Sequence, residues 1–432
     1  MSLTRLSVSL FSLGIIFFTL VVYFKRTLIS SESHGLTDFY KFYESVLFYF
    51  SGQDLYNNTF AAIVTPVISV WVRSDGNLST PFFTLLLLSL HYFNYARAFQ
   101  LWNAISVACI FLGGWLALRP FPQWHKNTLP IIALFALYLP NSQNLACGEI
   151  GAMLLVIVAG AWLLARKNHD ISAGMLIGFA CAIKLFCGLF LIYFLCLKRM
   201  RLLLAALIVF ILAFLLGGFV FGFNSYFSYH VILSSIYWYG ITWNVSFHGF
   251  FLRLFSNVEG NTPLILAPYL ANIFTTGCSV VLMGTLIWIW KKGGDQKFDT
   301  GFSLVIISML LLSPLGWVYY FPLLLIPYLV LVEEGNMGTH LAACFLLWLS
   351  TLTGNFLRPA QIKTLTQIFV AGGVGFYVLL GLLGLLSLVA FGVKRSEQDT
   401  ISESLWYVIY IVIFIPSLIS LGAIFRGIMA CH

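Results

Sequence analysis

A single carboxylate stands just after the first apolar segment of the chain. Asp38 opens an aromatic-rich stretch over residues 37–44, which follows an apolar run over 6–24. A carboxylate within hydrogen-bond reach of a hydroxyl nucleophile can accept its proton as a new bond forms, which is general-base catalysis. The same position also suits the start of a helix, because Asp and the neighbouring Thr37 are both favoured N-cap residues. The pattern therefore leaves two interpretations of Asp38, a general base and a helix cap.

A lysine interrupts another apolar run, between Gly178 and Gly188. A lysine embedded in such a run is energetically costly, so Lys184 is by default a candidate functional group. Its ammonium can pair with a phosphate as a point charge. Alternatively, a lysine near a helix end can extend along apolar surface and place its charge in water. The residues themselves leave both interpretations open.

Two further polar stretches break the apolar pattern. Residues 144–151 place Glu149 among glycines, where a carboxylate can hydrogen-bond a sugar hydroxyl and the backbone can turn tightly. Residues 313–320 combine a Ser-Pro-Leu-Gly break with aromatic side chains that include Trp317 and Tyr319. These aromatics can line a groove for a substrate. The alternatives are a plain loop for the first stretch and a proline kink between two spans for the second.

A third polar stretch, residues 243–249, brings amide, hydroxyl, imidazole and aromatic groups together. It contains Asn244 and His248, and Arg253 follows shortly after it. Such groups suit contacts with a sugar or a pyrophosphate. An aromatic belt at the membrane interface has a similar composition, so this alternative also stays open.

The chain that must position these groups is strongly apolar. Of its 432 residues, 60% are hydrophobic and 9% are charged, whereas about 25% are charged in an ordinary soluble domain. Its mean hydropathy is +0.94, and apolar runs of membrane length recur from end to end. The sequence therefore predicts an all-α, polytopic transmembrane bundle that forms one integral-membrane domain over residues 1–432.

Composition also excludes several classes of function. The net charge of +8 is scattered between the apolar runs and forms no basic tract, so we expect no nucleic-acid partner. The eight cysteines lie mostly inside apolar runs without Cys-x-x-Cys spacing, which argues against disulfides and structural zinc. The sequence contains no P-loop, which argues against ATP-driven transport.

Basic residues between the apolar runs predict the orientation of the chain, because such residues favour the cytoplasmic side. The clusters that we assign to this side are Arg119 with Lys126, Arg166-Lys167, Lys198 to Arg201, Lys291 to Lys297, and Lys394-Arg395. An even number of crossings must separate them. This makes 171–197 a hairpin of two short helices with Lys184 near its outer turn, and 127–165 a pair that turns at 141–149.

The same orientation places the first loop, residues 25–80, on the outer face together with Asp38. Lys25-Arg26 departs from the charge rule at this point. Segment 82–93 would be roughly 18 Å long as a helix, which is too short to cross the membrane upright. We expect about 11–13 membrane helices, with short outer-surface helices in the first loop. All the polar stretches then lie on the outer face.

Taken in order, these stretches resemble family 87 of the glycosyltransferases, which are GT-C-type membrane enzymes. The matching elements are Asp38-Phe39, Gly52 to Tyr56, Gly148-Glu149, Ala173 to Lys184, Asn244 to Gly249 with Arg253, and Ser313 to Trp317. Tyr319 stands where the family often has a histidine, and His248, in another loop, is the candidate replacement.

The resemblance implies a GT-C-like bundle that transfers a sugar at the outer face. It implies that Asp38 is the general base of an inverting displacement without metal or cofactor, and that Lys184 with Arg253 holds the donor phosphate. The substrate-binding candidates are Glu149, Asn244, His248, Trp317 and Tyr319.

We therefore expect a multi-pass enzyme of the cell (inner or plasma) membrane. It would transfer a hexose, mannose by family resemblance, from a polyprenyl-phosphate sugar to a lipid-linked or cell-envelope glycan acceptor, with membrane lipid around both substrates. Two other classes stay open: a transporter or flippase of isoprenoid-linked glycans, and an envelope-polymer polymerase or ligase. Convergence of Asp38, Lys184 and Arg253 on one cavity would favour the glycosyltransferase.

Overall fold

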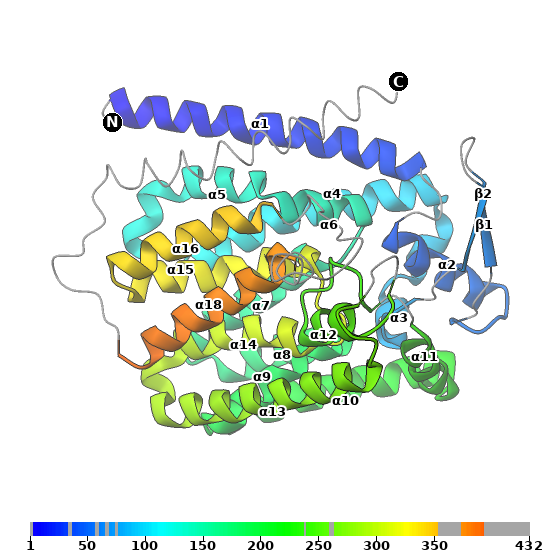
Figure 1. Ribbon diagram of the computed structural model, residues 1–432. Coiled ribbons are helices and arrows are strands. Elements are labelled where there is room, and N and C mark those ends of the chain that lie inside the picture. The colour runs from blue at the N-terminus through cyan, green and yellow to red at the C-terminus, as the bar shows by residue number, and fades with distance from the viewer. Residues whose placement is uncertain are drawn as a thin grey trace.

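The computed structural model shows a bundle of long and short helices packed around an extended apolar core (Figure 1). It describes residues 3–32, 37–56, 60–64, 69–73, 77–236, 239–258, 263–352 and 373–392. The predicted all-α, polytopic fold is confirmed. The basic pair Lys394-Arg395, which was assigned to the cytoplasmic side, lies outside the described residues.

Four helical stretches of the described chain are long and apolar enough to cross a membrane. They are α1 (Leu3–Glu32), α4 (Tyr95–Leu118), α10 (Met200–Phe221), and α13 (Pro268–Gly293) continued through η4 (Gly294–Lys297) into α14 (Phe298–Leu312). Shorter apolar helices complete the bundle, so the total of 11–13 membrane helices stays a prediction.

The shorter segments fall into two groups. Those inside the bundle are η2 (Pro122–Asn127), α5 (Thr128–Leu137), α6 (Leu139–Cys147), α7 (Gly151–Arg166), α8 (Asp170–Ile183), η3 (Leu185–Gly188), α9 (Leu189–Cys196), η5 (Val318–Leu324), α15 (Leu325–Glu334), α16 (Met337–Ser350) and α18 (Val374–Ala390). Those gathered at one end are α2 (Asp38–Phe50), α3 (Pro81–Leu86), η1 (Leu88–Tyr92), α11 (Asn224–Ser235) and α12 (Phe247–Phe255). The segment over 82–93, which is too short to cross the membrane upright, forms the two short helices α3 and η1.

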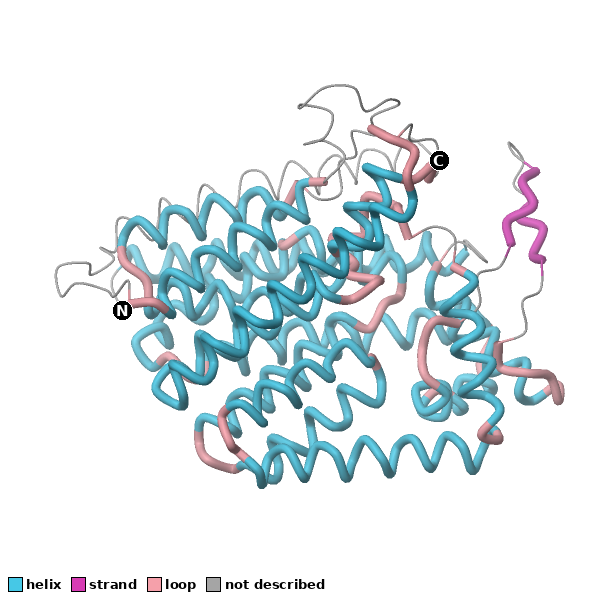
Figure 2. Tube along the Cα trace, turned by 60° about the horizontal axis from the view of Figure 1, so that its bottom comes forward, coloured by secondary structure: helices cyan, strands magenta, loops and turns pink. Residues whose placement is uncertain are grey.

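A small antiparallel hairpin adds the strands β1 (Phe60–Val64) and β2 (Ser69–Arg73). It stands beside the bundle, at the end that carries α2 and α3 (Figure 2). The hairpin was not predicted, although both segments are rich in the β-branched and apolar residues that favour strands.

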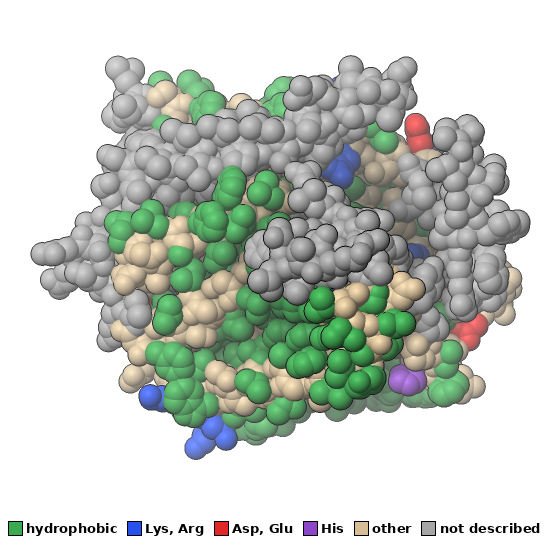
Figure 3. Space-filling view, viewed as in Figure 1, with side chains coloured by type: hydrophobic (Ala, Val, Ile, Leu, Met, Phe, Trp, Pro, Cys, Tyr) green, Lys and Arg blue, Asp and Glu red, His purple; other side chains and the backbone are tan. Residues whose placement is uncertain are grey.

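Basic loops gather at the opposite end of the bundle. Arg166 pairs with Asp299 at 2.5 Å, and Arg199 pairs with Asp170 at 3.1 Å. Because Asp170 begins α8 and Arg199 follows α9, the chain between them must leave this end and return to it. The predicted hairpin over 171–197 is therefore confirmed. Figure 3 shows further basic side chains at the end of α13 that lies away from α2 and α3.

The first helix links the two ends. Its N-terminus lies at the basic end, and it carries the chain to the end where α2 begins (Figure 1). The turn between α6 and α7, at residues 148–150, and the break after α8 reach that same end. The predicted pair over 127–165 turns at 148–150, at the end of the predicted stretch 141–149, because residues 139–147 form α6. Asp38, Glu149 and Lys184 lie at one end of the molecule.

Two glycines bring α8 against α10. A Cβ on Gly174 or Gly178 would collide with the carbonyl oxygen of Leu202 or Ala206 on the facing helix. Small residues four apart permit this close approach of two backbones in a membrane bundle. The packing fixes the position of α8, and hence of Lys184 directly after its last turn.

Candidate active site

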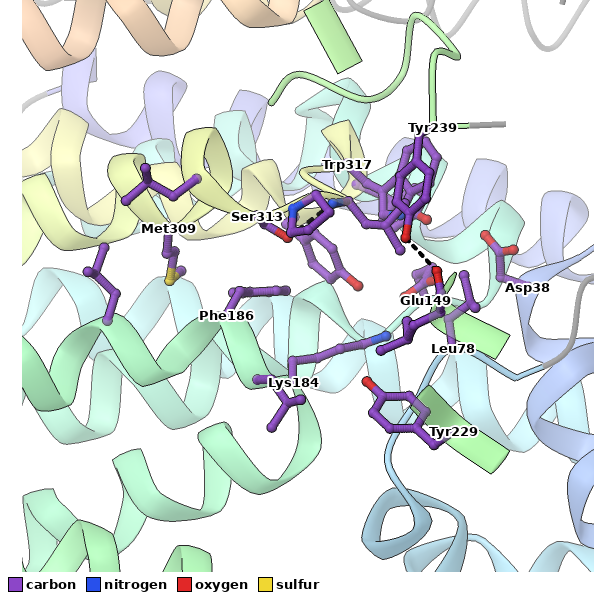
Figure 4. A pocket seen from close by; sticks show the side chains of 18 of the residues that line it. Asp38, Leu78, Glu149, Lys184, Phe186, Tyr229, Tyr239, Met309, Ser313 and Trp317 are labelled. Carbon is purple, nitrogen blue, oxygen red and sulfur yellow. Dashed lines mark hydrogen bonds between the residues drawn. The ribbon is translucent and has the colours of Figure 1, made fainter. Parts of the chain in front are cut away.

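A cavity of about 490 Å³ opens at the end of the bundle opposite the basic loops. Five of the eight predicted site residues line it: Asp38, Glu149, Lys184, Trp317 and Tyr319. Figure 4 shows Lys184 reaching from the end of α8 toward Glu149, with Asp38 at the far side. Its volume and mixed apolar and polar walls are typical of a small-molecule site.

Asp38 is the first residue of α2, and it does not cap this helix. The N-cap is Thr37, whose hydroxyl accepts the backbone N–H of Tyr40 at 3.3 Å. The Asp38 carboxylate instead pairs with the ammonium of Lys41 at 3.1 Å, and both side chains line the cavity. The side chain of Asp38 is 27% exposed, so its carboxylate can be reached by a bound molecule.

An apolar stripe on α2 turns Asp38 toward the cavity. Phe39, Phe42 and Val46 recur at helical spacing and are buried. The Phe39 ring packs against Phe99 and Trp102 of α4, with ring centroids 5.4 and 5.5 Å apart. These contacts fix the rotation of α2, so its neighbouring face, which carries Asp38 and Lys41, points into the cavity.

Phe39 also joins Asp38 to the turn that carries Glu149. Gly148 has φ +67°, and a Cβ built on it would lie 2.5 Å from the Cβ of Phe39. The carbonyl of Gly148 accepts the indole N–H of Trp102 at 2.8 Å. Phe39 and Gly148 therefore pack directly against each other, and the acidic residue beside each of them faces the same cavity.

Glu149 is 5% exposed and lies in the turn between α6 and α7. Its backbone N–H donates to the carbonyl of Asn144 at 2.9 Å, and its carboxylate accepts the N–H of Ile150 at 3.2 Å. Burial raises the pKa of this carboxyl, and the positive charge of Lys184 opposes that rise. Asp38 adds a smaller upward effect on the same pKa.

Lys184 follows α8 in an extended conformation, with φ −136°. Its ammonium donates to the hydroxyl of Ser79 at 3.2 Å and lies about 6 Å from the rings of Phe42 and Tyr320. The side chain lines the cavity between aromatic faces. This is the geometry of a cation held inside a site, in contrast to one that extends to the lipid surface.

The other three predicted residues do not line the cavity. The guanidinium of Arg253 is fully buried and donates to the carbonyls of Ile241 and Asn244 at 2.9 and 3.0 Å. The ring of His248 packs on that of Tyr239, with centroids 5.1 Å apart, and burial lowers its pKa. The expectation that Arg253 joins Lys184 at one cavity is thus wrong.

Asn244 ties two of the polar stretches together. Its side chain donates to the carbonyl of Pro314 at 2.7 Å and accepts the N–H of Gly316 at 3.1 Å. The backbone N–H of Val245 also donates to the carbonyl of Gly316, at 2.7 Å. The two stretches therefore pair along their backbones, and this pairing presents Trp317 to the cavity.

Other residues of the stretch 243–249 support the same contact with the loop over 313–317. The hydroxyl of Ser246 caps α12 by accepting the N–H of Gly249 at 3.1 Å. A Cβ on Gly249 would lie 2.8 Å from the side-chain carbon of Asn244. The Asn-x-Ser-x-x-Gly pattern thus has a structural explanation, in which each residue helps to hold the loop over 313–317.

Among the described residues, no group of three His, Cys, Asp or Glu side chains is placed to hold a metal ion. The chemistry on the cavity wall that the structure describes is that of carboxylates, ammonium groups and aromatic rings.

Comparison with known protein families decides the class of the molecule. The profile of glycosyltransferase family 87 matches residues 78–314, which is more than half of the chain. The chain belongs to glycosyltransferase family 87. No curated protein and no solved structure matches it. The resemblance drawn from the sequence is therefore confirmed, and the molecule is a membrane glycosyltransferase.

The family match ends before the loop with Trp317 and begins after Asp38. Membership of family 87 thus does not by itself place Asp38 in the site, and its place there rests on the geometry. The cavity of this glycosyltransferase also contains Lys41, Tyr229 and Tyr239, which the sequence analysis did not single out. Lys41 could have been predicted from the sequence, because it lies three residues after Asp38 and so on the same face of a helix.

Proposed function

We propose that this glycosyltransferase moves a hexose, mannose by family resemblance, from a polyprenyl-phosphate sugar to a lipid-linked or cell-envelope glycan acceptor. The observation that carries the proposal is that Asp38 and Lys184 line one cavity. A base for the acceptor hydroxyl and a cation for the departing phosphate are the two groups that such a transfer requires.

Lys184 is the group that would bind the donor phosphate. Its ammonium lies in the cavity, where it donates a hydrogen bond to the hydroxyl of Ser79 and is flanked by the rings of Phe42 and Tyr320. When the bond between the sugar and the phosphate breaks, the donor phosphodiester becomes a polyprenyl phosphomonoester with one additional negative charge. A fixed cation at that point stabilises the charge in the transition state.

An apolar arm of the cavity suits the polyprenyl tail. The apolar lining residues here are Leu185 and Phe186 of η3, Leu189 and Ile192 of α9, and Met309 of α14. Leu185 and Ile192 are 49% and 39% exposed, so this arm opens to the outside of the bundle, where lipid surrounds a membrane protein. A chain that enters here places its phosphate beside Lys184.

Asp38 would act as the base across the cavity. The acceptor oxygen forms a bond to the anomeric carbon as the bond from that carbon to the phosphate oxygen breaks. The hydroxyl proton passes to the Asp38 carboxylate, and the electron pair leaves with the phosphate. The ion pair with Lys41 orients this carboxylate. Glu149, Trp317 and Tyr319 would contact the sugar.

The three predicted residues outside the cavity would act indirectly, by holding the loop that forms part of its wall. We assign Asn244, His248 and Arg253 to positioning of the loop that carries Trp317 and Tyr319, because their described contacts go to that loop and to residues 239–244. This replaces the expected role of Arg253 as a phosphate ligand.

The orientation of the bundle supports a site on the outer face of the cell membrane. Basic loops favour the cytoplasmic side. The cavity lies at the end opposite the loops of Arg166 and Arg199, and the positive-inside rule therefore favours an outer location for it. This agrees with a multi-pass enzyme whose donor and acceptor both reside in the outer leaflet.

The test is Asp38→Asn in purified full-length protein, assayed with a radiolabelled polyprenyl-phosphate mannose and candidate acceptors. Loss of the base should lower turnover by about 10²–10⁴-fold while donor binding is kept. Glu44→Gln is the matched control, since Glu44 lies on the same helix but does not line the cavity. Normal turnover by the Asp38→Asn variant would refute the assignment of the base.

A further inference from the structure

Two acidic and two basic side chains line the cavity, but one acid–base pair is in direct contact and the other is not. Asp38 and Lys41 form a direct ion pair at 3.1 Å. Glu149 and Lys184 form no direct ion pair in the described structure, and the hydrogen bond of the ammonium goes to Ser79. The Glu149 carboxylate and the Lys184 ammonium thus influence each other across a space that a ligand can enter.

Of these four groups, Glu149 is the one whose ionised form is disfavoured by burial. It is 5% exposed, and its described hydrogen bond is the one from the N–H of Ile150. The titratable groups that interact with it electrostatically are Asp38 and Lys41 from α2, Cys147 from α6, Lys184 after α8, and Tyr319 and Tyr320 from η5. Tyr229 of α11 and Tyr239 also line the same cavity. Lys184 is the largest influence among them that favours its ionised form.

An anion that binds to Lys184 would cancel the electrostatic stabilisation that the ammonium gives to the ionised Glu149 carboxylate. The negative charge of the anion cancels the field of the ammonium at Glu149, and it adds its own repulsion to that of Asp38. Electrostatic interactions are stronger at a buried carboxylate than in bulk water, so a second uncompensated negative charge beside Glu149 is costly. The least costly response is for the carboxylate to take a proton, as coupled acidic groups do when they share a site.

We propose that binding of the donor phosphodiester beside Lys184 is accompanied by the uptake of one proton at Glu149. The proposal rests on the proposed function, which places the phosphate at Lys184. With Asp38, Lys41, Glu149 and Lys184 all ionised, their charges sum to zero, and after the phosphodiester and one proton are added the charges again sum to zero. A neutral carboxyl is also a hydrogen-bond donor, so Glu149 can then donate to a phosphate or sugar oxygen.

Proton uptake has a definite sign in a binding experiment. Because the complex holds one more proton than the free protein, affinity must increase as pH falls. The increase is about tenfold per pH unit between the pKa of Glu149 in the empty cavity and its higher pKa in the complex. Affinity levels off on the acidic side of this window, where Glu149 is already protonated before the ligand arrives.

The test uses geranylgeranyl methyl phosphate, a phosphodiester whose single negative charge does not change over the neutral pH range. Its binding to the detergent-solubilised full-length protein is measured by calorimetry in two buffers of different ionisation enthalpy, at a series of pH values. The wild type should take up about one proton per probe bound. Glu149→Gln should bind without proton uptake and with an affinity close to the acidic limit of the wild type. Glu44→Gln should match the wild type.

The outcomes separate this inference from the proposed function. Binding without proton uptake by the wild type, or equal uptake by the Glu149→Gln variant, overturns the proton coupling and leaves the phosphate site in place. Loss of uptake in the Glu44→Gln variant also overturns it, since the proton would then belong to another carboxyl. Failure of the wild type to bind the probe at any pH overturns both proposals.

Discussion

The contact between Phe39 and Gly148 makes a sharp test of how the site is assembled. Gly148 has φ +67°, and a Cβ there would lie 2.5 Å from the Cβ of Phe39 and 2.8 Å from a ring carbon of Phe99. Gly148→Ala thus forces both a left-handed backbone and a steric conflict. The residues that must move to relieve the conflict adjoin Asp38 and Glu149.

The magnitude follows from these two costs. An alanine in the left-handed region costs about 1–2 kcal/mol. Overpacking a filled core costs about 1–3 kcal/mol more. The variant should therefore lose about 2–5 kcal/mol of stability. A displacement of about 1 Å between reacting groups can lower turnover by about 10²-fold, so activity should fall as well.

Gly52→Ala is the matched control. Gly52 also has a positive φ, +74°, but no atom lies within 4 Å of the Cβ that alanine would add. It should lose only the backbone cost of about 1–2 kcal/mol and keep its turnover. Thermal unfolding in detergent and the sugar-transfer assay measure both variants. If Gly148→Ala is as mild as Gly52→Ala in both assays, the packing of Phe39 on Gly148 does not set the position of Asp38.

Three further predictions follow from the same geometry. Lys184→Gln should weaken binding of the phosphodiester probe by about 10–100-fold, since a charged hydrogen bond contributes about 1.5–3 kcal/mol; unchanged affinity in calorimetry would assign Lys184 to the lipid surface. Arg253→Met should lower the thermal midpoint, by a loss of about 2 kcal/mol or more, while the KM for donor stays as in the wild type; a selective rise in KM without destabilisation would restore its role as a phosphate ligand. Ile192→Trp should raise the KM for long-chain polyprenyl donors and leave that for short-chain donors unchanged; equal effects on both would place the tail elsewhere.

The sequence predicted those parts of the site that interrupt an apolar run. Lys184 was found because an ammonium in such a run is costly, and Asp38 because it opens an aromatic stretch directly after a span. The hairpin around Lys184 followed from charge alone, and the ion pair of Arg199 with Asp170 agrees with it. Lys184 and Asp38 are recognised from their immediate sequence neighbours, and the hairpin follows from the positive-inside rule applied to all the basic loops.

The same signals could not separate a ligand contact from a backbone contact. Asn244 and Arg253 are polar groups in an apolar chain, as Lys184 is. Yet Asn244 bonds to the backbone of the loop over 313–317, and Arg253 bonds to the carbonyls of residues 241 and 244. A loop and its partner come together only through tertiary packing, which sequence spacing does not reveal. Tyr229 and Tyr239 were missed for the same reason, since helices and loops far from Asp38 in sequence bring them to the cavity.

These backbone contacts explain why polar residues cluster at one end of an otherwise apolar bundle. The cavity exists because helices stop there: α6 at Gly148, α8 at Lys184 and α14 at Ser313. Each break leaves backbone groups without helical partners, and such groups need other hydrogen-bond partners where they are buried. Asn244 supplies partners for the break after α14, so its place in the polar pattern is a consequence of opening a cavity there. In such a chain, a polar residue marks the site in one of two ways, either by facing the substrate or by holding open the space that the substrate fills.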